Sequence, residues 1–230
     1  MDSPRPHDSK PPPLGHFLRE AGSFAAMKMR RLSRPRGGAA QVGEGRPVMV
    51  LPGFLASDTS SLLLRRTLEA SGYRACGWGL GLNMGVRNDL FDRLDRQLDR
   101  AARRGPVSLI GWSLGGVYAR ELAKRQPGKV ARVITMGSPF SGDIRANHGW
   151  RLYEILNGHK VDSQPMAATV GEKPPVPTIA FWSREDGIVA PASARGKPHE
   201  CDSSIELNCT HMGFMSDADA LRAVLAALAD

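Results

Sequence analysis

A serine flanked by glycines is the strongest chemical signal in the chain. Gly111-Trp112-Ser113-Leu114-Gly115 is a G-x-S-x-G motif that follows an apolar run and precedes an amphipathic segment. On a sharp strand-to-helix turn the serine hydroxyl projects outward, and the glycines let strand and helix pass closely. The alternative is a glycine-rich turn whose serine only caps the helix. We expect Ser113 to be a nucleophile, with Gly111 and Gly115 forming the turn.

A serine nucleophile needs a histidine base and a carboxylate that orients it. His211 lies just past the last expected strand, and Asp186 follows the strand before it. Because parallel strands end at one edge of a sheet, both side chains should lie at the edge where Ser113 emerges. His148 is the reserve candidate for the base, and Glu185 is the neighbouring carboxylate. The alternatives without catalysis are a loop histidine and an Asp-Gly turn.

Two backbone N–H groups are needed to stabilise an oxyanion. One should belong to Leu114, directly after the nucleophile. The other should belong to Phe54, because Gly53 in the turn after the first strand lets the backbone approach a substrate. That Pro-Gly turn is otherwise an ordinary loop. The candidates for pocket lining are Trp112, Trp78 and Phe140, although Trp78 could equally pack in the core.

The elements that position these residues alternate along the chain. Strands are expected at 48–54, 73–78, 107–112, 130–138, 176–183 and 204–209, and helices at 58–71, 88–104, 114–125 and 217–229. Strands that alternate with helices of this length predict an α/β fold with a mostly parallel sheet covered on both faces.

We expect two regions. Residues 1–46 should form a disordered, proline-rich basic tail, an amphipathic helix over 14–32 and a linker, and residues 47–230 should form the catalytic domain. Within that domain, 139–175 lacks strand character and should be a short cap over Ser113. The apolar stripe of the helix must be covered. Either it packs on the body or on a dimer partner, or 14–36 makes peripheral contact with an anionic membrane.

Composition and charge argue against several classes of protein. The 230 residues carry a formal charge of +8, with nine Lys/Arg and four Asp/Glu in residues 1–46, so the excess is concentrated there. No nucleic-acid motif accompanies it, and we expect no nucleic-acid partner. No run suits a bilayer span, no signal sequence is evident, and no metal or cofactor motif occurs. We therefore expect a cytoplasmic protein without cofactor, bound at most peripherally to the inner membrane surface. Whether Cys201 and Cys209 form a disulfide is left open by the sequence.

The segments VMVLPGFLASD, GWSLGGVYARELA, VITMGSPF, WSREDGIV and CTHMGF resemble the α/β-hydrolase superfamily, on the side of small bacterial lipases and esterases. The resemblance covers about 47–230, and the order Ser113, Asp186, His211 matches it. It implies a minimal version of that fold and a triad of these three residues. The chain departs from the superfamily in lacking the opening hairpin strands, in having Pro52-Gly53 where a His-Gly pair is common, and in its reduced late helices.

Three functions are compatible with these residues. The first is a serine hydrolase that cleaves a small-molecule or lipid ester through an acyl-enzyme. The second is an acyltransferase that uses the same triad, with an alcohol replacing water. The third is a catalytically silent binding protein that keeps the fold, since a fold does not establish a function. The sequence indicates neither the acyl length nor the oligomeric state.

Overall fold

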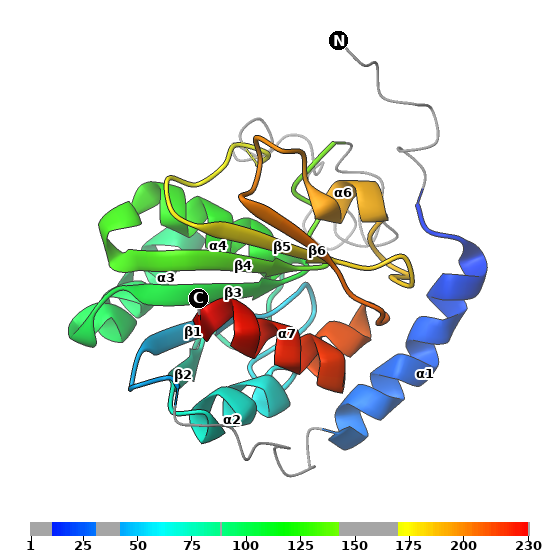
Figure 1. The fold of residues 1–230 in the computed structure, drawn as a ribbon, viewed down its shortest axis with the longest axis horizontal. Helices are drawn as coiled ribbons and strands as arrows, with labels where there is room; N and C mark the ends of the chain where they lie inside the picture. The colour runs from blue at the N-terminus through cyan, green and yellow to red at the C-terminus, as the bar shows by residue number, and fades with distance from the viewer. Residues whose placement is uncertain (1–10, 31–41, 88, 143–169, 230) are drawn as a thin grey trace.

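A six-stranded sheet crosses the centre of the protein in a computed structural model that describes residues 11–30, 42–87, 89–142 and 170–229 (Figure 1). The strand order is β2-β1-β3-β4-β5-β6, and every neighbouring pair is parallel. The strands are β1 (Pro47–Leu51), β2 (Arg74–Gly77), β3 (Val107–Trp112), β4 (Val130–Met136), β5 (Thr178–Trp182) and β6 (Ser203–Glu206).

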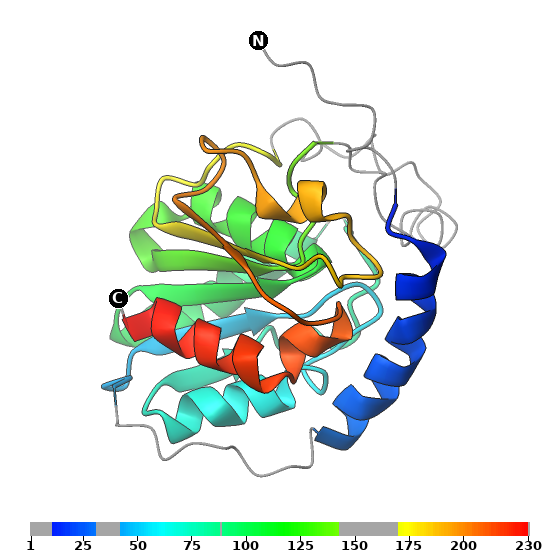
Figure 2. The same cartoon turned by 45° about the vertical axis from the view of Figure 1, so that its right-hand side comes forward.

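Helices cover both faces of this sheet. α3 and α4 pack on one face, and α2 and α7 pack on the other (Figures 1 and 2). The helices are α1 (Leu14–Arg30), α2 (Leu62–Ala70), α3 (Leu90–Ala101), α4 (Leu114–Arg125), α6 (Pro191–Arg195) and α7 (Ala218–Ala229). Short 3₁₀ turns are η1 (Ala102–Arg104), η2 (Pro127–Lys129) and η4 (Met212–Met215).

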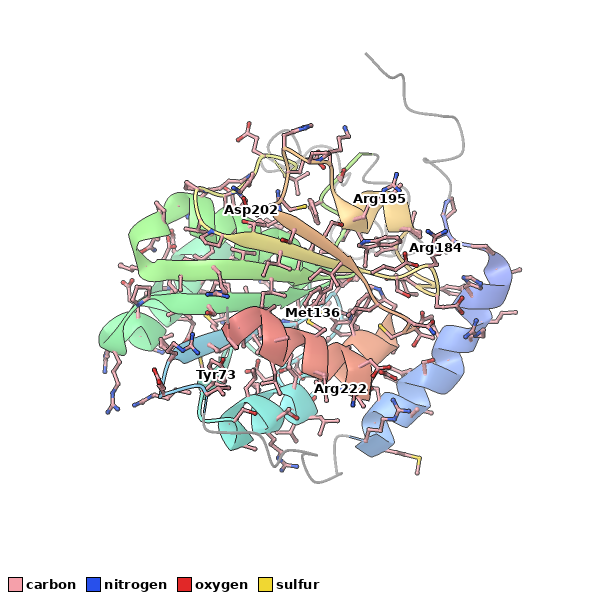
Figure 3. All side chains as sticks on the ribbon, in the orientation of Figure 1. Tyr73, Met136, Arg184, Arg195, Asp202 and Arg222 are labelled. Carbon is pink, nitrogen blue, oxygen red and sulfur yellow. The ribbon has the colours of Figure 1, made fainter. Side chains whose placement is uncertain are left out.

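Each face of the sheet has its own hydrophobic core. Val48 and Val50 of β1 contribute to the cluster beneath α2 and α7, whereas Met49 and Leu51 contribute to the cluster beneath α3 and α4. All four side chains are fully buried, which explains why this strand is apolar throughout rather than alternating. Met136 at the end of β4 lies in the first of these clusters, at the middle of the molecule (Figure 3). The predicted α/β class with a mostly parallel sheet is confirmed.

The prediction of element boundaries was most accurate around the serine motif, where β3 and α4 have the expected limits. α2 begins at Leu62 instead of residue 58. The reason is that the Asp58 carboxylate accepts hydrogen bonds from the backbone N–H groups of Trp78 and Gly79, 2.9 and 3.1 Å away, and so belongs to a turn that fixes the end of β2. The five-residue helix α6 was not predicted.

The expected cap, 139–175, is described only at its two ends, because 143–169 lies outside the described residues. Arg120, fully buried in α4, holds the returning end: its guanidinium donates to the carbonyls of Val170, Gly171 and Glu172 at 3.1–3.2 Å. Burial lowers the pKa of Arg120 to about 10, which leaves it charged at neutral pH. The predicted position of the cap over Ser113 stays a prediction.

Helix α1 contacts the rest of the protein through the side opposite to the one expected. The sequence placed its apolar stripe against the body as one option, but Leu14, Leu18 and Met29 of that stripe are 68%, 66% and 75% exposed. The buried residues of the helix are Glu20 and Met27. Packing of the stripe on the body is therefore wrong. The tail at 1–10 and the linker at 31–41 lie outside the described residues.

Within the described ranges, no helix combines the length and the apolar character that crossing a bilayer requires.

Candidate active site

Ser113 occupies a strained turn between β3 and α4. Its backbone has φ 54° and ψ −125°, a conformation that is costly for a residue with a side chain. The flanking glycines are required by space: a Cβ on Gly111 would lie 2.3 Å from the Cα of Gly116, and a Cβ on Gly115 would lie 2.3 Å from the carbonyl oxygen of Leu51. The structure thus places Ser113 on the sharp strand-to-helix turn that the motif predicted.

Asp186 and His211 form a direct contact. The Nδ1 atom of His211 lies 2.8 Å from Oδ2 of Asp186, and both residues are buried, with 2% of each exposed. The other carboxylate oxygen of Asp186 accepts the backbone N–H groups of Ile188 and Val189, each at 2.8 Å. Because a carboxylate only accepts, Nδ1 of His211 donates and its Nε2 is left as the basic nitrogen. This is the tautomer that a general base requires.

Trp112 connects the serine turn to His211. Its indole N–H donates to the carbonyl oxygen of His211 at 3.1 Å, and its ring lies 5.4 Å from the imidazole, centroid to centroid. The edge of Phe214 packs on the same imidazole. The residue before Ser113 therefore contacts His211, and the predicted nucleophile, base and acid lie at one edge of the sheet.

Two carboxylates influence His211. Burial by itself lowers the pKa of His211, but the charge of Asp186, its hydrogen bond to the ring and the charge of Glu20 outweigh burial, and the net effect raises the pKa above its ordinary value. Glu185, the neighbouring carboxylate considered from the sequence, instead pairs with Arg19 of α1. His148, the reserve base, lies outside the described residues.

Glu20 is a site residue that the sequence reasoning missed. It comes from α1, is 4% exposed, and accepts three backbone hydrogen bonds. Oε1 accepts from Gly187 at 2.9 Å and from His211 at 2.7 Å, and Oε2 accepts from Met212 at 3.1 Å. One carboxylate thus joins the loop that follows Asp186 to the loop that carries His211. The only signal in the sequence is that Glu20 is the sole acidic residue between 11 and 36.

The loop after β1 lies directly against the serine turn. A Cβ on Gly53 would lie 3.0 Å from the Cβ of Ser113, closer than ordinary van der Waals contact, so glycine favours this close approach of the backbone. The next residues are Phe54, the predicted oxyanion donor, and Leu55, whose φ of 57° marks a tight turn. Leu114 opens α4, where backbone N–H groups lack acceptors within the helix. Both predicted donors therefore belong to segments that adjoin Ser113.

Asn83 fixes the loop that follows β1, and this residue was not predicted from the sequence either. Its side chain is fully buried and donates to the carbonyl oxygen of Pro52 at 2.8 Å. Its backbone accepts from the N–H of Leu55 and donates to the carbonyl of Ala56, both at 2.8 Å. The segment 52–56 is thereby fixed at three points by one residue that follows β2.

The three aromatic candidates for pocket lining lie in packed surroundings. Trp78 is 2% exposed and donates to the carbonyl oxygen of Gly81. Phe140 is 1% exposed and lies beneath the Arg120 guanidinium, 4.1 Å from its ring centroid. Trp112 is 4% exposed and contacts His211 as described. Their contact with a substrate stays a prediction.

The cysteines are free thiols, so Cys201 and Cys209 are not joined in this structure. Burial raises the pKa of both thiols, which keeps them protonated and unreactive near neutral pH. Across the part of the chain that the structure describes, no group of three or more His, Cys, Asp or Glu side chains is arranged to hold a metal ion.

Comparison with known proteins identifies the fold. A metagenome-derived lipolytic enzyme superimposes with a TM-score of 0.62 at 15% identity, over 83% of this chain and 95% of that one. A monoacylglycerol lipase of Paleococcus ferrophilus gives 0.59 at 16% identity, over 80% and 96%. The carboxylesterase CesB of Bacillus subtilis gives 0.53 at 12% identity, over 93% and 98%. The chain has the α/β-hydrolase fold, as the sequence resemblance implied.

Comparison by sequence matches a smaller part of the chain than comparison by structure. No family model matches the chain. The biotin biosynthesis bifunctional protein BioHC of Teredinibacter turnerae is 43% identical over 60 residues, which is 26% of this chain and 10% of that protein. The match covers too small a part of that protein to indicate a shared activity.

Proposed function

We propose that the chain is a serine hydrolase that cleaves carboxylic esters through an acyl-enzyme on Ser113, His211 and Asp186. The observation that carries this proposal is the buried contact of 2.8 Å between His211 and Asp186 at the sheet edge where Ser113 occupies its strained turn. A buried carboxylate on Nδ1 leaves Nε2 of the histidine to accept a proton, which is the arrangement that nucleophilic serine chemistry uses.

The first half of the reaction forms the acyl-enzyme. Oγ of Ser113 attacks the ester carbonyl carbon while its proton passes to Nε2 of His211. The negative charge that develops on the carbonyl oxygen is stabilised by the backbone N–H groups of Leu114 and Phe54. The tetrahedral intermediate collapses, the bond to the alcohol oxygen breaks, and His211 gives its proton to the leaving alkoxide. The alcohol departs, and the acyl group remains on Ser113.

The second half regenerates the serine. Water enters, Nε2 of His211 takes one of its protons, and the hydroxide oxygen attacks the acyl carbonyl. Collapse of this second intermediate releases the carboxylic acid and returns the proton from His211 to Oγ of Ser113. Asp186 keeps the same hydrogen bond to Nδ1 throughout and stabilises the imidazolium that forms in each half.

The comparisons support a hydrolase because the superimposed structures are named as a lipolytic enzyme, a monoacylglycerol lipase and a carboxylesterase. At identities of 12–16% they support the fold more strongly than any substrate. An acyltransferase would use the same first half and differ only in the acceptor of the acyl group, so the test below includes an alcohol. A silent binding protein would have no need of a strained serine at the sheet edge that also carries a buried Asp–His pair.

The test is a panel of p-nitrophenyl esters of increasing acyl length, with wild type and Ser113→Ala and with or without an added alcohol. We expect wild type to release p-nitrophenol and free acid, and Ser113→Ala to lose the activity. Acyl transfer that dominates at low alcohol concentration would instead indicate the acyltransferase. No Ser113-dependent turnover of any ester would reject both enzymes.

A further inference from the structure

Helix α1 carries its apolar side outward. Seven apolar residues of this helix are exposed: Leu14, Phe17, Leu18, Ala21, Phe24, Ala25 and Met29. At 100° per residue they occupy one continuous arc, which we call the outer face. The buried Glu20 and Met27 lie on the opposite side. A surface helix ordinarily turns its apolar arc toward the core, so this orientation needs a reason.

Polar contacts fix the helix in this orientation. Glu20 accepts three backbone N–H groups of the body, and Arg19 and Arg30 form ion pairs with Glu185 and Asp217. Rotating the helix to bury the outer face would remove the partners of Glu20 and leave two buried amides and one partly buried amide without this acceptor. The outer face is therefore held toward solvent by the contacts of the other side. Figure 3 shows side chains that project from α1 away from the body.

The α1 segment is rich in cations. Residues 11–36 contain six Lys/Arg and a single acidic residue, Glu20, which is turned inward and bound to the body. Arg19 and Arg30 pair with carboxylates of the body, and among the described residues of α1 Lys28 is the cation on the outer face. Lys28 lies over the ring of Phe24, 4.4 Å from its centroid, so a cation sits on the apolar arc itself. Two copies of this helix would bring like charges together. An anionic surface complements both the charge and the apolar arc.

We propose that α1 lays its outer face into the interface of an anionic lipid bilayer. An amphipathic helix with cations beside its apolar arc lies in the plane of such an interface, with apolar side chains among the acyl chains and cations at the lipid phosphates. The protein then rests on the bilayer by this helix, without spanning it.

The position of α1 gives this docking a consequence for the candidate site. The helix lies beyond the carboxyl ends of the strands, the same edge that carries Ser113 (Figures 1 and 2). Two other exposed leucines follow strands at that edge: Leu55 after β1 and Leu82 after β2, 41% and 53% exposed. A bilayer that receives α1 therefore faces the edge of the sheet that carries the candidate site. This consequence rests on the proposed hydrolase, whereas the docking itself does not.

The experiment is sedimentation of the full chain with vesicles of phosphatidylglycerol and phosphatidylcholine at low salt. The test variant is Leu14→Gln/Leu18→Gln, which changes two exposed side chains of the outer face. The matched control is Ile205→Gln, an exposed apolar residue on β6 outside α1. We expect wild type and Ile205→Gln to sediment, and the double variant to partition roughly tenfold or more weakly.

Further measurements distinguish a lipid bilayer from other partners of the outer face. Vesicles of phosphatidylcholine alone, or added salt, should reduce the binding of wild type, because the cations would then lack anionic partners. Soluble-ester kinetics and melting temperature of the double variant should match wild type, since these residues lie outside the site. Wild type that ignores anionic vesicles overturns the proposal, as does a double variant that sediments normally. A wild-type dimer that the double variant dissociates, without vesicle binding, would assign the outer face to a second copy and likewise overturn it.

Discussion

The carboxylate of Glu20 accepts the backbone N–H of His211 at 2.7 Å, although the two residues are 191 positions apart in the chain. The same oxygen also accepts the N–H of Gly187, which follows Asp186. Because these amides belong to the two loops that carry the proposed acid and base, a residue of α1 fixes how those loops lie relative to each other. The packing is tight: a Cβ on Gly187 would lie 2.4 Å from the carbonyl oxygen of His16 in α1.

Replacing Glu20 should therefore affect both stability and the pH profile. Glu20→Ala leaves two buried amides and one partly buried amide without this acceptor and should lower the free energy of unfolding by roughly 3 kcal/mol. Glu20→Gln keeps an acceptor oxygen but removes a charge that raises the pKa of His211. Since the base must be neutral to act, a lower pKa moves the acid limb of the kcat/KM profile to lower pH.

The control for Glu20 is Glu69→Gln, which removes an exposed carboxylate from α2. Its melting temperature and acid limb should match wild type. If the acid limb of Glu20→Gln also matches wild type, and Glu20→Ala melts normally, Glu20 does not position the proposed triad.

Asp186→Asn should reduce kcat by about 10²–10⁴-fold, because the imidazole loses the charge that orients it and stabilises its protonated form. The remaining activity should show an acid limb at lower pH than wild type, since Asp186 raises the pKa of His211. Glu185→Gln is the control one residue away, because Glu185 pairs with Arg19 at the surface. The measurement is the steady-state rate of each variant across pH. A severe loss of kcat in Glu185→Gln with a mild loss in Asp186→Asn would contradict the assignment of Asp186 as the orienting carboxylate.

Asn83→Ala should impair the proposed oxyanion loop without changing the triad. The carbonyl of Pro52 loses its partner and the segment 52–56 loses one of its three attachments, so the N–H of Phe54 should shift. We expect kcat to fall by roughly tenfold or more while KM changes little, because an oxyanion donor acts mainly in the transition state. Equal kcat values for Asn83→Ala and wild type would show that this loop does not contribute.

The sequence was sufficient to place the candidate residues that follow strands, while their catalytic roles stay predictions. Ser113 follows an apolar strand and opens a helix between two glycines, and Asp186 and His211 each follow a strand, so chain order alone brings them to one edge. Glu20 and Asn83 act on backbone groups of distant segments, and such partners leave no mark in local spacing. An acidic residue within an amphipathic helix is ordinarily expected to face solvent.

The orientation of α1 could not be predicted for a related reason. Periodicity shows that a helix has an apolar arc, but the side that packs on the body depends on the groups that the body presents to the helix. Here the body presents three backbone amides to Glu20 and an apolar position to Met27. The role of Arg120 could not be predicted for the same reason. Its place in α4 suggests an ordinary helical residue, whereas the carbonyls to which it donates belong to the distant segment 170–172.

The most direct test of the proposed function is to label the full chain with a fluorophosphonate and map the adduct by mass spectrometry. A serine activated by a histidine base attacks this reagent, whereas ordinary serines do not. We predict a single adduct on the peptide that contains Ser113, absent in Ser113→Ala and formed at least about 10²-fold more slowly in Asp186→Asn. An unlabelled wild type, or an adduct that persists in Ser113→Ala, would contradict the account.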